Sequence, residues 1–290
     1  MLKPVEKTLF PKIFHDIIGH MYKDFFGFRE NPFNITCDPD FFFPSAHHEE
    51  AFSHLIFGIK QRKGILVITG EIGTGKTTLC RTLISRLDQH VKTALILNPY
   101  FSETQLLRLI LADLGISGNF KNKLDLIQAL NAYLLDESSH GNNVAVIIDE
   151  AQNLKPRQLE QIRLLSNLET QKNKLLQIIL VGQPELLDHL RLDSLRQLNQ
   201  RISVRYHMLP LEEDETRRYI EHRLRLAAHH SNGVLPAQFT PEALAAVYHF
   251  SKGTPRLINI ICDRALLNAF VSETRSIDEH IICKSAREAT

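Results

Sequence analysis

The sequence has few cysteines, no excess of charge and no long apolar run. Its four cysteines are Cys37, Cys80, Cys262 and Cys283, and they include no C-x-x-C pair. This spacing argues against a zinc ribbon and a disulfide framework and favours a reducing, intracellular setting. With 34 basic and 33 acidic side chains, the net charge of +1 creates no global attraction to nucleic acid or to an anionic membrane, although a local patch remains possible. The longest apolar runs, "GILVIT" and "VAVII", fall far short of the roughly 20 residues that span a bilayer, so we expect no transmembrane segment.

The first residues form a pattern of their own. Between residues 9 and 25 the apolar side chains recur at helical spacing and predict an amphipathic helix: Leu9, Phe10, Ile13, Phe14, Ile17, Ile18, Met21 and Phe25. The stretch lacks the basic start, uninterrupted apolar centre and small-residue cleavage site of a signal peptide. We expect it to pack on its own protein or on a partner. A membrane-surface helix is the alternative, although its polar face would be richer in Lys and Arg.

From residue 64 onward, short branched apolar runs alternate with segments of helical periodicity, which is typical of an α/β domain with a mainly parallel sheet. Five strands with helices between them are predicted, at residues 65–69, 93–98, 144–149, 176–182 and 202–208. The fold class is therefore α/β, with a five-stranded, mainly parallel sheet covered by helices on both faces.

After residue 211 the strand patterns end and only helices are predicted. Thr240 and Thr254, each followed by proline, are expected to be helix N-caps with proline in the first turn. The expected organisation is an amphipathic and aromatic lead-in over 1–46, an α/β domain over 47–210 and a small all-helical lid domain over 211–290.

A glycine-rich stretch follows the first predicted strand and opens a predicted helix. Gly70, Gly73, Gly75, Lys76 and Thr77 fit G-x-x-x-x-G-K-[ST], the phosphate-binding loop of P-loop NTPases. Glycines let successive N–H groups point inward, and the helix N-terminus adds positive charge. Lys76 is expected to meet the β- and γ-phosphates, and the Thr77 hydroxyl to ligate Mg²⁺. The remaining loop residues in the predicted nucleotide site are Glu71, Ile72, Thr74 and Thr78, of which Thr78 is expected mainly to pack against the backbone.

Two carboxylates follow the third predicted strand, in "VAVIIDEAQNL". At the carboxyl edge of an open α/β sheet they face the ligand crevice. Asp149 is expected to hold the Mg²⁺ shell, and Glu150 to orient and deprotonate an attacking water. Alone, such a pair could simply cap the next helix; together with the phosphate loop it indicates hydrolysis.

Charge that develops on the γ-phosphate needs further hydrogen-bond donors. The candidates are Gln183 at the end of the fourth predicted strand, Arg201 just before the fifth, and Arg256 in "GTPR" at the start of a helix in the lid. For each arginine the alternative is a surface ion pair.

These motifs together resemble those of AAA+ ATPases, over residues 47–290. In addition, "MYKDFFGFRENPFNITCDPDFFFPSAHHEEAF", "IIDEAQNL", "ILVGQPEL", "LNQRISVRYHM" and "GTPRLINIICDRALLNAF" are similar, motif by motif, to the general secretion pathway A proteins of the ExeA and GspA type. That similarity covers residues 21 to about 288. Secretion-type members typically continue into a transmembrane segment and a periplasmic peptidoglycan-binding region, so we expect either a stand-alone homologue or the ATPase portion of a longer protein.

The resemblance implies ATP with Mg²⁺, Arg256 touching the γ-phosphate in cis, and Arg201 reaching the nucleotide of a neighbouring subunit, hence a homo-oligomer. It also suggests that Asn98 holds Glu150 inactive until a ligand binds, although an ordinary capping Asn is the alternative. His47 is expected near the adenine or, alternatively, at the surface. The implied setting is cytoplasmic, possibly peripheral to the inner membrane, with an inner-membrane secretion-system protein as partner.

Four alternatives are weighed against this function. A zinc site is not expected, because the histidines near residues 47 and 229 have no cysteine at a suitable spacing. The aromatic residues between 25 and 43 lack interleaved Lys and Arg, so core packing is expected rather than base stacking on single-stranded nucleic acid. A DNA-binding transposition helper of the MuB or TniB kind shares the AAA+ core, but the near-neutral charge counts against it. The last alternative is a nucleotide-gated module that barely turns over, which the intact Glu150 disfavours.

Overall fold

The computed structural model describes residues 22–97, 99–229 and 236–288. Contacts divide the chain into two compact units, Cys37–Leu209 and the combination of Met1–Thr36 with Pro210–Thr290. The predicted lead-in over 1–46 is thus shared between the two units. Most of the amphipathic helix predicted over residues 9–25 lies outside the described residues.

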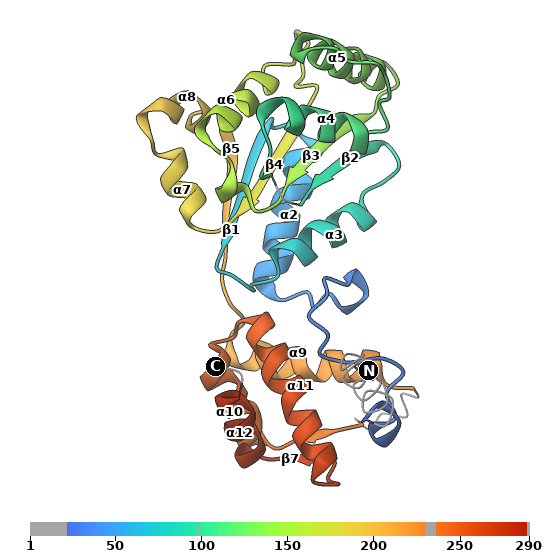
Figure 1. Ribbon diagram of the computed structural model, residues 1–290, viewed down its shortest axis with the longest axis vertical. Helices are drawn as coiled ribbons and strands as arrows, with labels where there is room; N and C mark the ends of the chain where they lie inside the picture. The colour runs from blue at the N-terminus through green and yellow to red at the C-terminus, as the bar shows by residue number, and fades with distance from the viewer. Residues whose placement is uncertain (1–21, 98, 230–235, 289–290) are drawn as a thin grey trace, which may run out of the picture. The chain divides into compact units, whose positions relative to one another are not determined.

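The first unit contains a five-stranded parallel sheet in the order β2-β3-β4-β1-β5 (Figure 1). Its strands are β1 (Ile65–Gly70), β2 (Val91–Ile96), β3 (Asn143–Ile148), β4 (Gln177–Gly182) and β5 (Ile202–Met208). The predicted α/β class with a parallel sheet is confirmed, and each strand begins and ends within two residues of its predicted limits.

Two separate apolar layers hold the helices on this sheet. Because side chains alternate along a strand, Ile65 and Val67 enter one layer while Leu66 and Ile68 enter the other. The first layer is covered by α4 (Glu103–Asp113), α5 (Lys123–Ser139), α6 (Pro156–Leu165), α7 (Glu185–Leu190) and α8 (Arg196–Asn199). The second is covered by α2 (Ala46–Lys60) and α3 (Lys76–Arg86). Every residue of β1, β3 and β4 is buried, as continuous apolar runs between two helical layers require.

The second unit consists mainly of α9 (Glu213–Ala227), α10 (Pro241–Ser251), α11 (Pro255–Val271) and α12 (Glu279–Arg287). Thr240 caps α10 as predicted, since its side chain accepts from the N–H of Ala243. Thr254 occupies the N-cap position of α11, but its side chain makes no capping hydrogen bond.

The expectation that helices alone follow residue 211 is wrong in one detail. Two-residue strands β6 (Gln238–Phe239) and β7 (Ser276–Ile277) pair in parallel, with hydrogen bonds from the N–H of Gln238 to the Arg275 carbonyl and from the N–H of Thr240 to the Ile277 carbonyl. Strands of two residues are too short to show a two-residue periodicity, so the sequence pattern gives no sign of this pair.

Aromatic residues of the lead-in pack inside the second unit. Phe28 and Phe33 are 1% exposed, and the ring of Phe25 lies 5.4 Å from that of Phe270. The buried Arg223 of α9 donates to the carbonyls of Pro32 and Asn34. These contacts are those of core packing. In the part of the chain that the structure describes, no helix is both long and apolar enough to cross a bilayer.

Gly253, between α10 and α11, provides a test of this packing. Its φ is +72°, and an added Cβ would lie 1.8 Å from the carbonyl oxygen of Leu211. Gly253→Ala is expected to lower the free energy of unfolding by about 2–5 kcal/mol, the sum of left-handed strain of about 1–2 kcal/mol and overpacking of about 1–3 kcal/mol. Denaturant unfolding followed by far-UV circular dichroism measures the change.

Gly27 is the matched control, because its φ is +74° but nothing lies within 4 Å of an added Cβ. Gly27→Ala should cost only the strain, about 1–2 kcal/mol. Equal losses in the two variants would show that the contact with Leu211 does not contribute.

Candidate active site

The glycine-rich loop joins the carboxyl end of β1 to the amino end of α3. Gly73 and Gly75 have φ angles of +82° and +97°, a backbone region that other residues rarely adopt. Gly75 is the N-cap of α3, so the first N–H groups of that helix lie at the loop. The predicted strand–loop–helix arrangement is therefore present.

Two of these glycines also provide room for neighbouring parts of the unit. An added Cβ on Gly70 would lie 2.9 Å from the carbonyl oxygen of Met208, at the end of β5. One on Gly75 would lie 2.8 Å from Nε2 of His48 in α2. The loop is thus packed between the end of β5 and the first turn of α2.

The side chain of Lys76 turns back into the loop. Its Nζ donates to the carbonyls of Gly70 at 2.7 Å and Glu71 at 2.8 Å, and the residue is 7% exposed. Burial lowers the pKa of this ammonium, while Glu150 and Asp149 act in the opposite direction. A buried cation near several N–H groups forms a site for an anion of more than one charge.

Thr77 and Asp149 meet although 72 residues separate them along the chain. The Thr77 hydroxyl donates to Oδ2 of Asp149 at 2.5 Å, and the other carboxylate oxygen accepts from the N–H of Glu150 at 2.9 Å. Asp149 is 2% exposed, and burial raises its pKa, although both hydrogen bonds oppose the rise. A hydroxyl and a carboxylate are the oxygen donors that Mg²⁺ prefers, so these residues fit that ion.

Glu150 follows Asp149 in a left-handed conformation with φ +52° and ψ +37°. Its Oε2 accepts from Nε2 of Gln152 at 2.6 Å and from Nε2 of Gln183 at 3.5 Å. Gln152 also accepts from the backbone N–H of Gln183 at 3.0 Å. Gln183 thus lies beside Glu150 at the end of β4. The sequence analysis did not predict a role for Gln152, because no motif of fixed spacing in "VAVIIDEAQNL" singles it out.

The other loop residues differ in exposure. Thr74 is buried and its hydroxyl donates to the Glu71 carbonyl at 2.9 Å, which stabilises the turn. Glu71 and Ile72 are exposed, and Ile72 retains 59% of its accessible surface. Thr78 is half-buried in the first turn of α3.

The two histidines at the start of α2 have different surroundings. Nδ1 of His47 lies 3.2 Å from the hydroxyl of Tyr206, which itself donates to Glu50. His48 is 5% exposed; its Nε2 lies 3.2 Å from the Thr74 carbonyl, and its Nδ1 lies 2.6 Å from the Ser45 hydroxyl. A carbonyl only accepts, so Nε2 of His48 carries a proton and donates to the phosphate loop. His48, adjacent to the predicted His47, is thus the residue that supports the loop.

The predicted arginines lie at the surface of their units. Arg201 is exposed and donates to the side-chain carbonyl of Asn167, which follows α6. Arg256 is exposed in the first turn of α11, in the second unit. Asn98 lies outside the described residues. Over residues 22–97, 99–229 and 236–288, no three His, Cys, Asp or Glu side chains are grouped to hold a metal ion.

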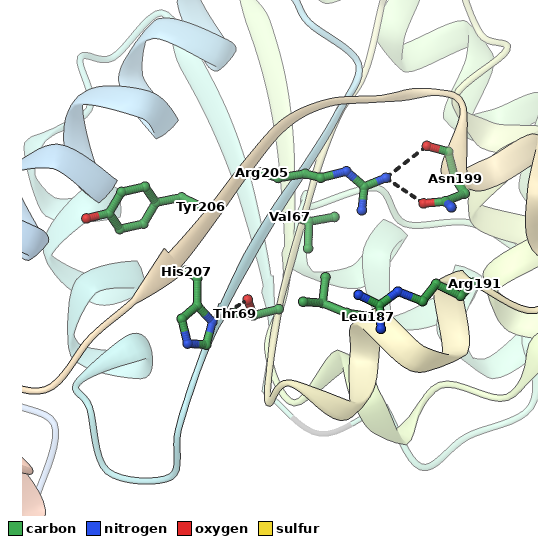
Figure 2. Close-up of a pocket in the computed structure, with 8 residues that line it drawn as sticks. All are labelled: Val67, Thr69, Leu187, Arg191, Asn199, Arg205, Tyr206 and His207. Carbon is green, nitrogen blue, oxygen red and sulfur yellow. Dashed lines mark hydrogen bonds between the residues drawn. The ribbon is translucent and has the colours of Figure 1, made fainter.

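A cavity of about 350 Å³ runs beside β1 and β5. Figure 2 shows Arg205 and Arg191 reaching into the same space, while Tyr206 points to the other side of β5. Burial and then Arg191 lower the pKa of Arg205, whose guanidinium donates to Asn199. The lining residues belong to β1, α7 and the residue after it, α8 and β5, and include no member of the phosphate loop. The chemistry of the loop and carboxylates therefore lies outside this cavity.

The burial of Asp149 predicts how stability depends on pH in the absence of nucleotide and magnesium. Burial raises the pKa of Asp149 above the unfolded value of about 3.9, so the folded state binds this proton more tightly than the unfolded state does. The stabilisation that comes from the bound proton is therefore lost as pH rises from about 3.9 through the raised pKa. Asp149→Asn removes the cost of the charge. We expect a higher melting temperature than wild type at pH 7, by roughly 2–4 °C for each kcal/mol, and a smaller difference toward pH 4.

Scanning calorimetry across this pH range measures both proteins, with the exposed Asp193→Asn as control. An Asp149→Asn melting temperature at or below wild type at pH 7, or a difference that grows as pH falls, would contradict the assignment of a costly buried charge.

Comparison with known sequences agrees with this geometry. A family profile described as an AAA domain matches residues 59–190, which contain the phosphate loop, both carboxylates and Gln183. General secretion pathway protein A of Aeromonas hydrophila is 42% identical over 271 residues, which is 93% of this chain and 49% of that protein. The chain thus spans about half the length of this curated relative.

Solved structures show the same fold at low identity. The ORC2 protein of Aeropyrum pernix in its ADPNP–ADP complexes has a TM-score of 0.65 at 18% identity, over 90% of this chain and 72% of that one. Cdc6p of Pyrobaculum aerophilum has a TM-score of 0.66 at 18% identity, over 87% and 71%. The RuvB branch migration motor of Thermotoga maritima has a TM-score of 0.54 at 15% identity, over 84% and 69%. The chain is therefore a relative of the general secretion pathway A proteins and carries an AAA domain with the P-loop fold.

Proposed function

We propose that this chain binds ATP with Mg²⁺ and hydrolyses it to ADP and phosphate, as an oligomeric motor or switch in the assembly or energising of a cell-envelope secretion system. One observation carries the proposal. Lys76, Thr77, Asp149 and Glu150 converge at the carboxyl ends of β1 and β3, where an open α/β sheet binds its ligand.

The phosphate loop accounts for binding. Its N–H groups and the amino end of α3 attract phosphate oxygens, and Lys76 adds a full positive charge. Burial lowers the pKa of Lys76, so a polyphosphate would favour its charged form by replacing the two weak carbonyl acceptors. The ORC2 protein, which shares the fold, was solved with ADPNP and ADP.

The carboxylates account for hydrolysis. Thr77 and Asp149 would hold Mg²⁺, which neutralises charge on the phosphates when bound. Glu150 takes a proton from the attacking water as general base. Gln183, whose amide lies 3.5 Å from the Glu150 carboxylate, would donate a hydrogen bond to the transferred phosphoryl group.

The oligomer follows from the role proposed for Arg201. This exposed arginine would reach a nucleotide held by a neighbouring subunit, while Arg256 would act in cis from the lid. The secretion role rests on the relative named general secretion pathway protein A. We therefore propose a homo-oligomer that works with an inner-membrane secretion-system protein, from the cytoplasm or the inner face of that membrane.

Glu150→Gln tests the general base. It keeps the size of the side chain and removes its basicity, so kcat for ATP hydrolysis should fall by about 10²–10⁴-fold while the Kd for ATP changes little. Phosphate release and equilibrium binding of a fluorescent ATP analogue measure the two quantities. The matched control is Glu213→Gln, an exposed acid in the first turn of α9. Unchanged turnover in Glu150→Gln would assign the base elsewhere.

Arg201→Ala tests for a shared site. The ATPase rate per subunit of the wild type should rise with protein concentration, because assembly supplies the arginine, and the variant should lose about 10³-fold or more in kcat. Arg196→Ala, an exposed arginine five residues earlier, is the control and should behave as wild type. A rate that is independent of both concentration and Arg201 would mean that each subunit hydrolyses ATP alone.

A further inference from the structure

Gln152 lies at the centre of a hydrogen-bonded chain between two strand ends. It belongs to the short 3₁₀ helix η2 (Ala151–Asn153), which directly follows Glu150. Its amide nitrogen donates to Oε2 of Glu150 at 2.6 Å, and its amide oxygen accepts from the backbone N–H of Gln183 at 3.0 Å. One side chain thus connects Glu150, two residues after β3, to Gln183, the first residue after β4.

Gly182, the last residue of β4, provides the room for this amide. A Cβ at this position would lie 2.8 Å from Oε1 of Gln152 and 3.2 Å from its backbone nitrogen. The φ of Gly182 is not in the left-handed region, so the conformation of this residue does not itself require glycine. Glycine is favoured there by the close approach of Gln152, and Cδ2 of Leu186 would lie 3.2 Å from the same Cβ.

The backbone at Glu150 is held by hydrogen bonds of its own. A left-handed backbone conformation costs a residue other than glycine of order 1–3 kcal/mol, and it persists where the surrounding structure fixes it. Here the N–H of Asn153 donates to the Glu150 carbonyl at 2.9 Å, and the N–H of Glu150 donates to Asp149. These two bonds fix the turn, whereas the Gln152 amide fixes the carboxylate.

We propose that Gln152 is a positioning residue that holds the Glu150 carboxylate in register with Gln183, so that the base and the γ-phosphate donor respond to nucleotide as one unit. The inference rests on the proposed ATPase function and assigns Gln152 no contact with substrate. Gln183 donates only weakly to Glu150, at 3.5 Å, so the strong connection between them runs through Gln152. Loss of the amide leaves the base able to ionise but free to leave its position.

Steady-state kinetics on the whole chain test this role. Gln152→Met keeps the length of the side chain and removes both hydrogen bonds, so kcat should fall by about 10–100-fold, as for residues that orient a catalytic group. The Kd for a fluorescent ATP analogue should change by less than about twofold, because the phosphate loop is intact. Gln161→Met, which removes a buried amide from α6, is the control and should keep wild-type kcat.

Gly182→Ala displaces the same amide without changing Gln152. It should lower kcat to a similar extent alone, and by less than about twofold in the Gln152→Met background, because both changes break one interaction. Gln152→Glu separates the two bonds: it keeps an acceptor for the Gln183 N–H but repels the Glu150 carboxylate, so kcat should fall as in Gln152→Met. Melting temperatures identify any variant that fails to fold, in which case the remaining variants decide.

The outcomes separate the two proposals. A wild-type chain that binds no ATP, or releases no phosphate from it, would overturn the proposed function and this inference with it. A wild type that turns over normally, with Gln152→Met or Gly182→Ala at the same kcat, would overturn the inference alone. So would additive losses in the double variant, because they would mean that the two residues act independently.

Discussion

The burial of opposite charges at one edge of the sheet is the constraint on which the rest of the site depends. Lys76 and Asp149 are both nearly inaccessible, and burial shifts both pKa values toward the neutral forms. Buried charges are costly unless partners compensate them. Loop carbonyls and the Thr77 hydroxyl provide only part of that compensation. Under the proposed function, a polyphosphate with a divalent cation would provide the rest, so the unligated site is organised at the expense of stability.

The fold makes this arrangement possible by placing rigid elements around the glycine-rich loop. The central strands are buried on both faces, which fixes the carboxyl ends of β1, β3 and β4 side by side. Glycine at positions 70, 75 and 182 then lets β5, His48 and Gln152 approach these ends closely. The loop is consequently held by His48 of α2 and by the end of β5, and the Glu150 carboxylate by Gln152 of η2. The candidate catalytic groups on loops thus take their precision from the sheet.

Much of this was predictable from the sequence, because the relevant signals are local. Branched apolar runs predicted all five strands, and the spacing of Gly70, Gly73, Gly75, Lys76 and Thr77 predicted the loop between β1 and α3. His48 and Gln152 were not predicted. Each makes one of its hydrogen bonds to a residue 26 or more positions away, Thr74 for His48 and Gln183 for Gln152, and neither belongs to a pattern with fixed spacing. The β6–β7 pair was not predicted either, because a strand of two residues shows no periodicity.

The dependence of ATP affinity on Mg²⁺ tests the central claim most directly. Isothermal titration calorimetry would measure the Kd for a non-hydrolysed ATP analogue with and without Mg²⁺, in wild type and in Thr77→Val, which keeps the shape of the side chain and removes its hydroxyl. We predict that Mg²⁺ tightens binding to the wild type and has little effect on binding to the variant, while the two proteins bind the Mg²⁺-free analogue similarly. Equal tightening by Mg²⁺ in both proteins, or no binding to the wild type, would contradict the account.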